Sequence, residues 1–167
     1  MIYLLDASVL ITANNLYYPI DRVPEFWEWV LFHADSGNIR MPLEIIDEIL
    51  AGTKKDDLLV DWMKDHKEAL LLDEEVEAQL LREVVTIGYA PDLTDDELEQ
   101  IGQDPFVIAY ARAKPDRSVV TTEVPKPSKT RQNRQIPDVC DSFSVDWLHT
   151  FGLTRALDFR TSWRKLI

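Results

Sequence analysis

The sequence predicts an α/β protein built on βαβ units with a central parallel sheet. Apolar segments typical of strands alternate with segments that carry apolar residues at helical spacing, as in βαβ units. The strand-like segments are continuously apolar, as in strands that are covered on both faces. With 167 residues, 46% of them hydrophobic, the chain can fill one core, so we expect a single domain over residues 1–167.

The first strand-like segment, MIYLLDASVLIT, holds one charged residue in an otherwise apolar run. Residues 2–5 and 9–11 read together as a buried strand, with Asp6 between them. Burying a lone carboxylate there costs several kcal/mol. A helix N-terminus, a hydrogen-bonded turn or a metal ion shared with other carboxylates would offset that cost.

The next elements are bounded by proline and glycine. Pro24 and Gly37 stand at the start and stop of one helical pattern, and Pro42 and Gly52 bound another. The expected order is helix, strand and three helices, at residues 22–37, 37–42, 42–52, 56–72 and 73–88.

The second half of the chain begins with a polar connector at residues 89–103. A helix follows at residues 104–114, with Asp104 as its N-cap and Pro105 at its first position. The segment RSVVTTE, residues 117–123, is the next strand.

Composition excludes several classes of protein. No apolar run approaches the roughly 18 residues of a membrane span, and the N-terminus lacks the pattern of a signal peptide. We therefore expect a cytoplasmic protein without a membrane partner. The single cysteine, Cys140, excludes an intramolecular disulfide framework and a cysteine-rich zinc site.

Charge is distributed unevenly along the chain. The net charge of −12 would argue against a nucleic-acid partner, because phosphate binding needs a basic surface. Residues 1–111 hold 24 acidic and 7 basic side chains, whereas residues 112–167 hold 6 and 11. A basic segment between Arg112 and Arg134 is therefore available in an otherwise acidic protein.

Four acids fall near the expected carboxyl ends of the strands or on the helices that follow them: Asp6, Glu48, Asp104 and Glu123. Open parallel sheets bind their ligands at this edge. Carboxylates gathered without neighbouring Lys or Arg repel one another unless a divalent cation is bound. Because all these ligands are oxygens, the sequence predicts a site for Mg²⁺ or Mn²⁺.

Simpler interpretations stay open for each acid taken alone. Asp104 before Pro105 would cap a helix whether or not it binds a ligand. Glu48 has acidic neighbours, so a solvated helix face would also explain it, and Asp47 is the alternative ligand. Only the joint pattern favours a metal site.

Four segments resemble, in order, the successive motifs of PIN-domain ribonucleases: LLDASVLI, MPLEIIDEILAG, DPFVIAYARA and VVTTE. The segments NNLYYPIDRVPEFWEWV and QIPDVC are similar to a less characterised PIN-like subfamily. The resemblance implies an α/β/α fold and metal-dependent cleavage of RNA, and many members of the family are VapC-type toxins paired with an antitoxin. Departures from the family pattern are Glu123, where Asp is usual, and a long insert at residues 56–103.

The resemblance also implies residue roles, with metal-site acids at Asp6, Glu48, Asp104 and Glu123 and active-site hydroxyls at Ser8 and Thr121. Asp6 and Asp104 would hold the main ion, and Glu48 would bind it directly or through water. Glu123 would position a second ion or a water. Bound Mg²⁺ would lower the pKa of a water molecule and stabilise the leaving oxygen.

The expected function is therefore a divalent-metal-dependent endoribonuclease, with an antitoxin and a second copy of the chain as further partners. The alternative is a catalytically silent PIN-like module that binds RNA or protein. A haloacid-dehalogenase-type enzyme would need an acid where Ser8 stands. A response-regulator receiver would need a lysine after a late strand, which Lys126 supplies poorly.

The segment PKPSKTRQNRQIP, residues 125–137, is typical of a loop. Because it follows Glu123, it would lie over the mouth of the site. We interpret its cations as contacts to RNA phosphates: Lys126, Lys129, Arg131 and Arg134. A solvated surface loop and a contact to an acidic antitoxin segment are the alternatives, and Arg112, Lys114 and Arg117 are the next candidates for binding RNA.

Overall fold

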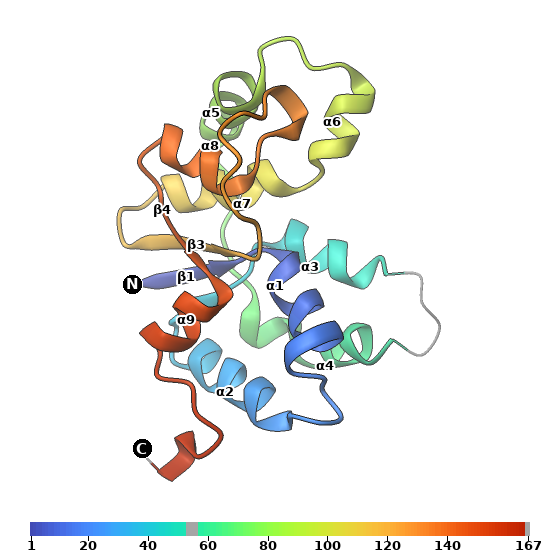
Figure 1. Ribbon diagram of the computed structural model, residues 1–167, viewed down its shortest axis with the longest axis vertical. Helices are drawn as coiled ribbons and strands as arrows, with labels where there is room; N and C mark the ends of the chain where they lie inside the picture. Colours follow the sequence, from blue (N-terminus) through green and yellow to red (C-terminus); the bar gives the residue numbers. More distant parts are fainter. Residues whose placement is uncertain (53–56, 166–167) are drawn as a thin grey trace.

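A four-stranded, all-parallel sheet forms the centre of the molecule (Figure 1). The computed structural model describes residues 1–52 and 57–165, so Asp56, the first residue of the expected insert, lies outside the described residues. The strands are β1 (Ile2–Leu5), β2 (Ile39–Arg40), β3 (Arg117–Thr121) and β4 (Asp146–His149), in the order β2-β1-β3-β4. The first three match the sequence prediction, whereas the short strand β4 was not expected.

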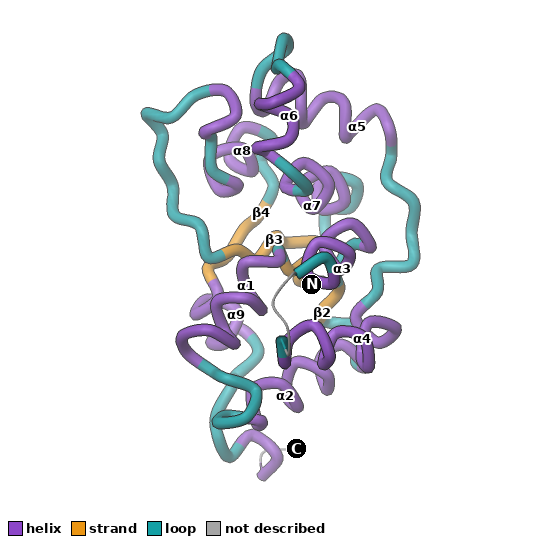
Figure 2. Tube along the Cα trace, turned by 90° about the vertical axis from the view of Figure 1, so that its right-hand side faces the viewer, coloured by secondary structure: helices purple, strands orange, loops and turns teal. Residues whose placement is uncertain are grey.

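Helices cover both faces of this sheet, which makes the predicted three-layer α/β/α sandwich. Figure 1 shows α5, α6, α7 and α8 on one side and α1, α2, α4 and α9 on the other, and the turned view of Figure 2 agrees. The α-helices of the described residues are α1 (Ala7–Thr12), α2 (Pro24–Asp35), α3 (Leu43–Leu50), α4 (Leu58–Leu70), α5 (Ala78–Glu83), α6 (Asp95–Ile101), α7 (Asp104–Arg112), α8 (Ile136–Ser142) and α9 (Thr150–Ala156). Shorter turns are the π-helical η1 (Ala13–Tyr17) and η2 (Val84–Tyr89) and the 3-10 turns η3 (Arg131–Asn133) and η4 (Trp163–Lys165). No helix in the described ranges is long and apolar enough to cross a membrane.

The apolar residues that follow Asp6 belong to a helix, so the prediction of one strand through residues 9–11 was wrong. Asp6 is extended, with φ −73° and ψ 152°, and is the N-cap of α1. Val9 and Leu10 are fully buried, whereas Ile11 is 36% exposed. Short apolar runs look alike in strands and buried helices, because only length and flanking residues distinguish them.

The boundary of α7 differs from the prediction by one residue. Gln103 is its N-cap, and Asp104 is the first helical residue, followed by Pro105. The Asp104 carboxylate therefore does not cap the helix. Helix boundaries are uncertain by one or two residues in sequence reasoning, but here the shift leaves the carboxylate free for another role.

The expected connector at residues 89–103 contains a helix, α6. Its start is a capping box, in which the Glu97 N–H donates to Thr94 Oγ1 at 3.3 Å and the Thr94 N–H donates to Glu97 Oε2 at 2.8 Å. Asp95 and Asp96 add negative charge to the first turn, which favours the positive end of the helix dipole. The helix was missed because it is polar and lacks a wide apolar stripe.

Gly88, in η2, allows the insert to pack closely against α8. A Cβ atom at this position would lie 2.8 Å from Val139 Cγ1 and 2.9 Å from Phe143 Cε2, so a larger residue would force the two elements apart. Gly152, in α9, has more room, because its nearest neighbours, atoms of Leu148, would lie at 3.4 Å.

We expect Gly88→Ala to lower the free energy of unfolding by about 1–3 kcal/mol, because overpacking displaces Val139 or Phe143. The matched Gly152→Ala should stabilise the protein by about 0.5–1 kcal/mol, because alanine favours the helix. Urea unfolding of both variants measures the difference. Equal effects of the two substitutions would contradict the close packing at Gly88.

Candidate metal centre

The candidate site lies at the carboxyl ends of β1 and β3. The chain leaves β1 for β2 on one side and returns to β3 on the other, so the order of strands reverses here. Ligands of open α/β sheets bind at such a switch point. Asp6 directly follows β1, and its N–H donates to the Val120 carbonyl of β3 at 2.9 Å.

The Asp6 carboxylate is held by hydroxyl groups from two segments. It is only 5% exposed. Its Oδ2 accepts a hydrogen bond from Thr121 Oγ1 at 3.1 Å and a short one from Ser8 Oγ. Burial raises the pKa of Asp6, while the Ser8 and Thr121 hydroxyls lower it and offset part of that rise. Both hydroxyls predicted for the site therefore contact its central acid.

The charge of Asp6 raises the pKa of each of the other three acids. The pKa of Asp104 is raised well above its usual value, first by burial and then by the charges of Asp6, Glu123 and Glu48. Burial and the charge of Asp6 also raise the pKa of Glu48, which is the most exposed of the four. Four acids from separate segments therefore share one region. Within residues 1–52 and 57–165, none of the four forms an ion pair with Lys or Arg.

Glu123 has a second, structural contact. Its Oε2 accepts the N–H of Ile136 at the start of α8 at 2.6 Å. Burial raises the pKa of Glu123, whereas this hydrogen bond lowers it. Asp138, in the first turn of the same helix, accepts the N–H of Lys126 at 2.8 Å. The two acids thereby fasten both ends of the loop at residues 125–137.

The donor set fits a hard divalent cation, because its four carboxylates supply only oxygen ligands. No group of three or more His, Cys, Asp or Glu residues in the described part of the chain is arranged closely enough to hold a metal ion. The carboxylates lie within electrostatic range of one another but are more widely spread than direct ligands. Metal binding therefore requires these side chains to draw together.

The two arginines of the predicted RNA-binding loop contact the protein itself. Arg131 pairs with Asp92 and Glu97, each at 2.7 Å, and its hydrogen bond is the main cause that lowers the pKa of Glu97 to about 2. Arg134 donates to the carbonyls of Gly88 and Asp138 and to the Ser142 hydroxyl. Both guanidinium groups therefore hold the insert to the loop.

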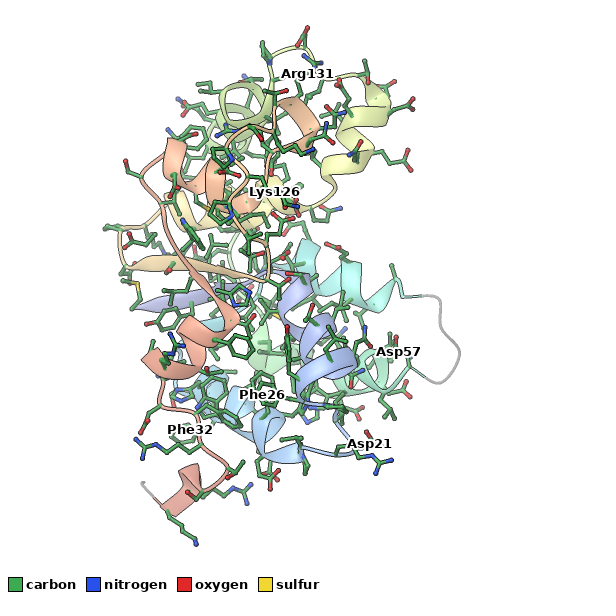
Figure 3. All side chains as sticks on the ribbon, viewed as in Figure 1. Asp21, Phe26, Phe32, Asp57, Lys126 and Arg131 are labelled. Atoms are coloured by element: carbon green, nitrogen blue, oxygen red, sulfur yellow. The ribbon has the colours of Figure 1, made fainter. Side chains whose placement is uncertain are left out.

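The two lysines of this loop are placed differently. Lys126 and Lys129 are exposed, and neither forms an ion pair with a described residue. The charge of Lys126 lowers the pKa of Glu123, so this ammonium group lies near the acids. Figure 3 likewise places Lys126 nearer to the sheet than Arg131.

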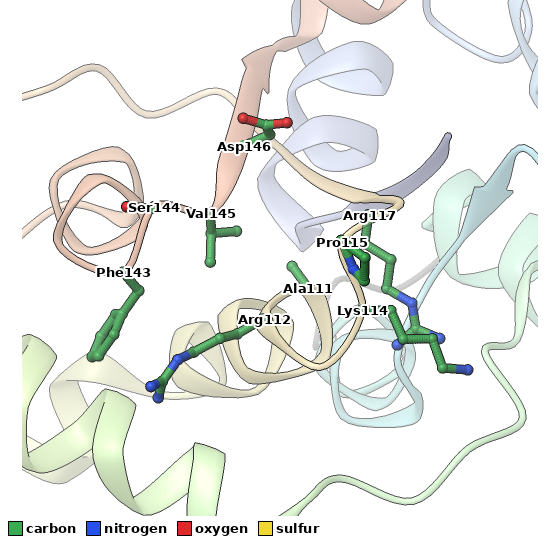
Figure 4. A pocket seen from close by; sticks show the side chains of 9 residues that line it. All are labelled: Ala111, Arg112, Lys114, Pro115, Arg117, Phe143, Ser144, Val145 and Asp146. Carbon is green, nitrogen blue, oxygen red and sulfur yellow. The ribbon is translucent and has the colours of Figure 1, made fainter.

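The remaining cations of the basic segment lie at the opposite edge of the sheet. A cavity of about 280 Å³ opens at the amino ends of β3 and β4, between Arg112, Lys114 and Arg117 on one side and the 143–146 segment on the other (Figure 4). Arg117 and Lys114 pair with Glu74 at 2.7 and 2.8 Å. Arg112 pairs with Glu83 and lies over the Phe143 ring. These three cations are paired with Glu74 or Glu83 and lie at the opposite edge of the sheet from the four acids.

Sequence reasoning missed two polar groups at the site. Asp138 is 8% exposed, and its charge raises the pKa of Glu123. Tyr89 is 6% exposed, and its phenol is affected by the charges of Asp104 and Glu123. The residue before Asp138 is Pro137, a helix-start signal that could have indicated it. No sequence pattern points to Tyr89.

In the metal-free protein we expect stability to fall as the pH rises from about 4 through the raised pKa values of the site acids. The unfolded chain releases its carboxyl protons near pH 4, whereas the folded chain holds those of the site to higher pH, so ionisation in this window favours unfolding. Thermal unfolding at several pH values tests this. Stability from Glu97 is already complete above about pH 5, because its pKa is lowered.

The matched variant for this experiment is Asp104→Asn, because an amide does not titrate. In this variant, the unfolding temperature should fall less steeply with rising pH than in the parent. The same slope in the variant and the parent would show that Asp104 does not carry a raised pKa.

Comparison with known proteins identifies a family. The family model described as "Domain of unknown function (DUF4411)" matches residues 3–161. No curated protein and no solved structure gives a significant match to the chain. The matched range runs from β1 to beyond α9 and includes all four acids of the candidate centre. The chain belongs to the DUF4411 family.

Proposed function

We propose that this protein is a divalent-metal-dependent endoribonuclease of the PIN type that hydrolyses RNA phosphodiesters. The observation that carries the proposal is the gathering of Asp6, Glu48, Asp104 and Glu123 at the switch point of the sheet without an ion pair to any Lys or Arg among the described residues. Carboxylates that raise one another's pKa at a cleft are characteristic of functional sites, because a purely structural cluster would include Lys or Arg.

In this proposal the acids bind Mg²⁺ or Mn²⁺, which would lower the pKa of a bound water molecule and stabilise the leaving oxygen of the phosphodiester. Asp6 and Asp104 are the main ligands. Glu48, the most exposed of the acids, binds directly or through water, and Glu123 serves a second position. Ser8 and Thr121 orient the Asp6 carboxylate through their hydrogen bonds to Oδ2.

The surroundings leave room for a substrate beside the acids. An open hollow of about 520 Å³ is lined by residues of α3, including Glu44 and Glu48, and by Gly102 and Gln103 just before α7. This hollow borders Asp104, the next residue along the chain. A phosphodiester entering here would reach the acids without displacing a helix.

We expect Asp104→Asn to abolish RNA cleavage in Mg²⁺ or Mn²⁺, by several orders of magnitude in kcat, because an amide is a weaker ligand for a hard cation. Chelation of the metal should have the same effect on the parent. Asp65→Asn is the matched control, because Asp65 is an exposed acid of α4 that does not line the hollow. Full activity of Asp104→Asn, or loss of activity in Asp65→Asn, would contradict the proposed metal centre.

We assign the RNA phosphate contacts to Lys126 and Lys129, because Arg131 and Arg134 are engaged within the protein. Replacing both lysines with alanine should weaken RNA binding for all sequences and reduce the salt slope by about 0.7 per lost contact. Exchanging Lys64 and Lys67 of α4 for alanine changes the charge equally and serves as the control. Identical RNA affinity and salt slope in the two double variants would place the RNA elsewhere.

The second candidate is a catalytically silent module on the same fold, which binds RNA or protein. It would bind RNA without cutting it in the presence of Mn²⁺. The PIN resemblance extends the first candidate to a toxin with a protein antitoxin and to a homodimer. A small DNA-binding protein encoded beside this chain would support the toxin role, and a monomeric mass in solution would exclude the dimer.

A further inference from the structure

The hydroxyl group of Tyr89 is buried at the metal centre without a hydrogen-bond partner. Tyr89 is the last residue of η2, and its side chain is 6% exposed. Its Oη finds no partner among the described residues. Burying an unpaired hydroxyl opposes folding, so such a group calls for an explanation.

The neighbours of this phenol are the acids of the candidate centre. Burial raises the pKa of Tyr89 well above its usual value, and the charges of Asp104 and then Glu123 raise it further. A phenol hydroxyl can donate a hydrogen bond to an ionised carboxylate, which has no hydrogen to donate in return. As a neutral donor, it adds no positive charge that would compete with a metal ion.

The Tyr89 hydroxyl has no hydrogen bond among the described residues, but contacts of the neighbouring residues hold the backbone at this position. The preceding residue, Gly88, lies close against Val139 and Phe143 of α8. Its carbonyl accepts a hydrogen bond from Arg134. The next residue, Ala90, donates its N–H to the Val85 carbonyl at 3.0 Å. The backbone on both sides of Tyr89 is thus held in place before any ligand binds.

Among the three less exposed acids of the site, Asp104 is the one that lacks a donor. Asp6 accepts the hydroxyls of Ser8 and Thr121, and Glu123 accepts the N–H of Ile136. The Asp104 carboxylate accepts no hydrogen bond within residues 1–52 and 57–165. An unpaired donor and an unpaired acceptor therefore lie in the same part of the site.

We propose that Tyr89 is a positioning residue whose hydroxyl donates to Asp104 when a divalent cation draws the acids together. One oxygen of Asp104 then binds the ion, and the other is oriented by Tyr89. Ligating carboxylates are commonly held by such hydrogen bonds. The inference rests on the proposed metal centre and gives the insert, which carries Tyr89, a part in assembling it.

The test compares Tyr89→Phe with Tyr110→Phe. Each variant removes one hydroxyl and keeps the ring, but Tyr110 donates to the Glu74 carbonyl at 3.1 Å, away from the acids. Calorimetric titration with Mn²⁺ should show an affinity about 10–100-fold lower for Tyr89→Phe, as expected for the loss of a group that orients a ligand, and unchanged for Tyr110→Phe.

Thermal unfolding without metal separates this role from a structural one. Tyr89→Phe should unfold at the same or a higher temperature than the parent, because its hydroxyl has no partner in that state, whereas Tyr110→Phe should unfold at a lower temperature. A lower unfolding temperature for metal-free Tyr89→Phe, or Mn²⁺ affinity equal to that of the parent, would overturn the inference.

RNA cleavage by the parent distinguishes failure of the inference from failure of the proposed function. Weaker Mn²⁺ binding by Tyr89→Phe supports the positioning role even if the parent cuts no RNA, in which case only the nuclease assignment falls. If the parent cuts RNA but Tyr89→Phe binds Mn²⁺ as tightly as the parent does, the nuclease assignment stands and the role of Tyr89 is excluded. A parent that binds no Mn²⁺ overturns both.

Discussion

The burial of Asp6 between two parallel strands is the constraint around which the site is built. A carboxylate at this position would destabilise the fold if it were left in an apolar core. The chain turns into α1 directly after it, which exposes the N–H groups of the first helical turn to the carboxylate, and the Ser8 and Thr121 hydroxyls contact it directly. These contacts offset only part of the cost, because the pKa of Asp6 remains raised. The nearby acids increase the repulsion, and a cation is the partner that would relieve it.

Within the described residues, the buried charge at the amino edge of the sheet is paired, whereas the four acids at the carboxyl edge are unpaired. At the amino edge, the side chain of Arg117 is 1% exposed and makes two hydrogen bonds to the Glu74 carboxylate, at 2.7 and 2.8 Å, and one to the Tyr110 carbonyl. Removing one partner of such a pair would leave an uncompensated buried charge. At the carboxyl edge, none of the four acids forms such a pair with a described Lys or Arg. The two edges therefore differ in whether charge is paired within the described part of the protein.

Most cations of the basic segment between Arg112 and Arg134 bind other groups of the protein. The acidic insert supplies Asp92 and Glu97, and the basic C-terminal part supplies Arg131, which binds both. Arg134 binds backbone carbonyls of the insert and of α8. Individual exposed ion pairs contribute little to stability, but together these contacts hold the insert to the loop at residues 125–137. A basic segment in the sequence is therefore not by itself a nucleic-acid surface.

The sequence by itself determined the α/β class and three of the four strands, and it pointed to four acids that the structure brings into one region. Continuous apolar runs, Pro and Gly at helix ends and acids at strand ends are local signals, so they can be read without a structure. The helical state of residues 9–11, the capping-box helix α6 and the free carboxylate of Asp104 depended on local geometry that such signals do not resolve. Only the tertiary structure decided which cations pair with acids and brought Tyr89 within electrostatic range of Asp104, because these interactions join segments that are separated in the chain.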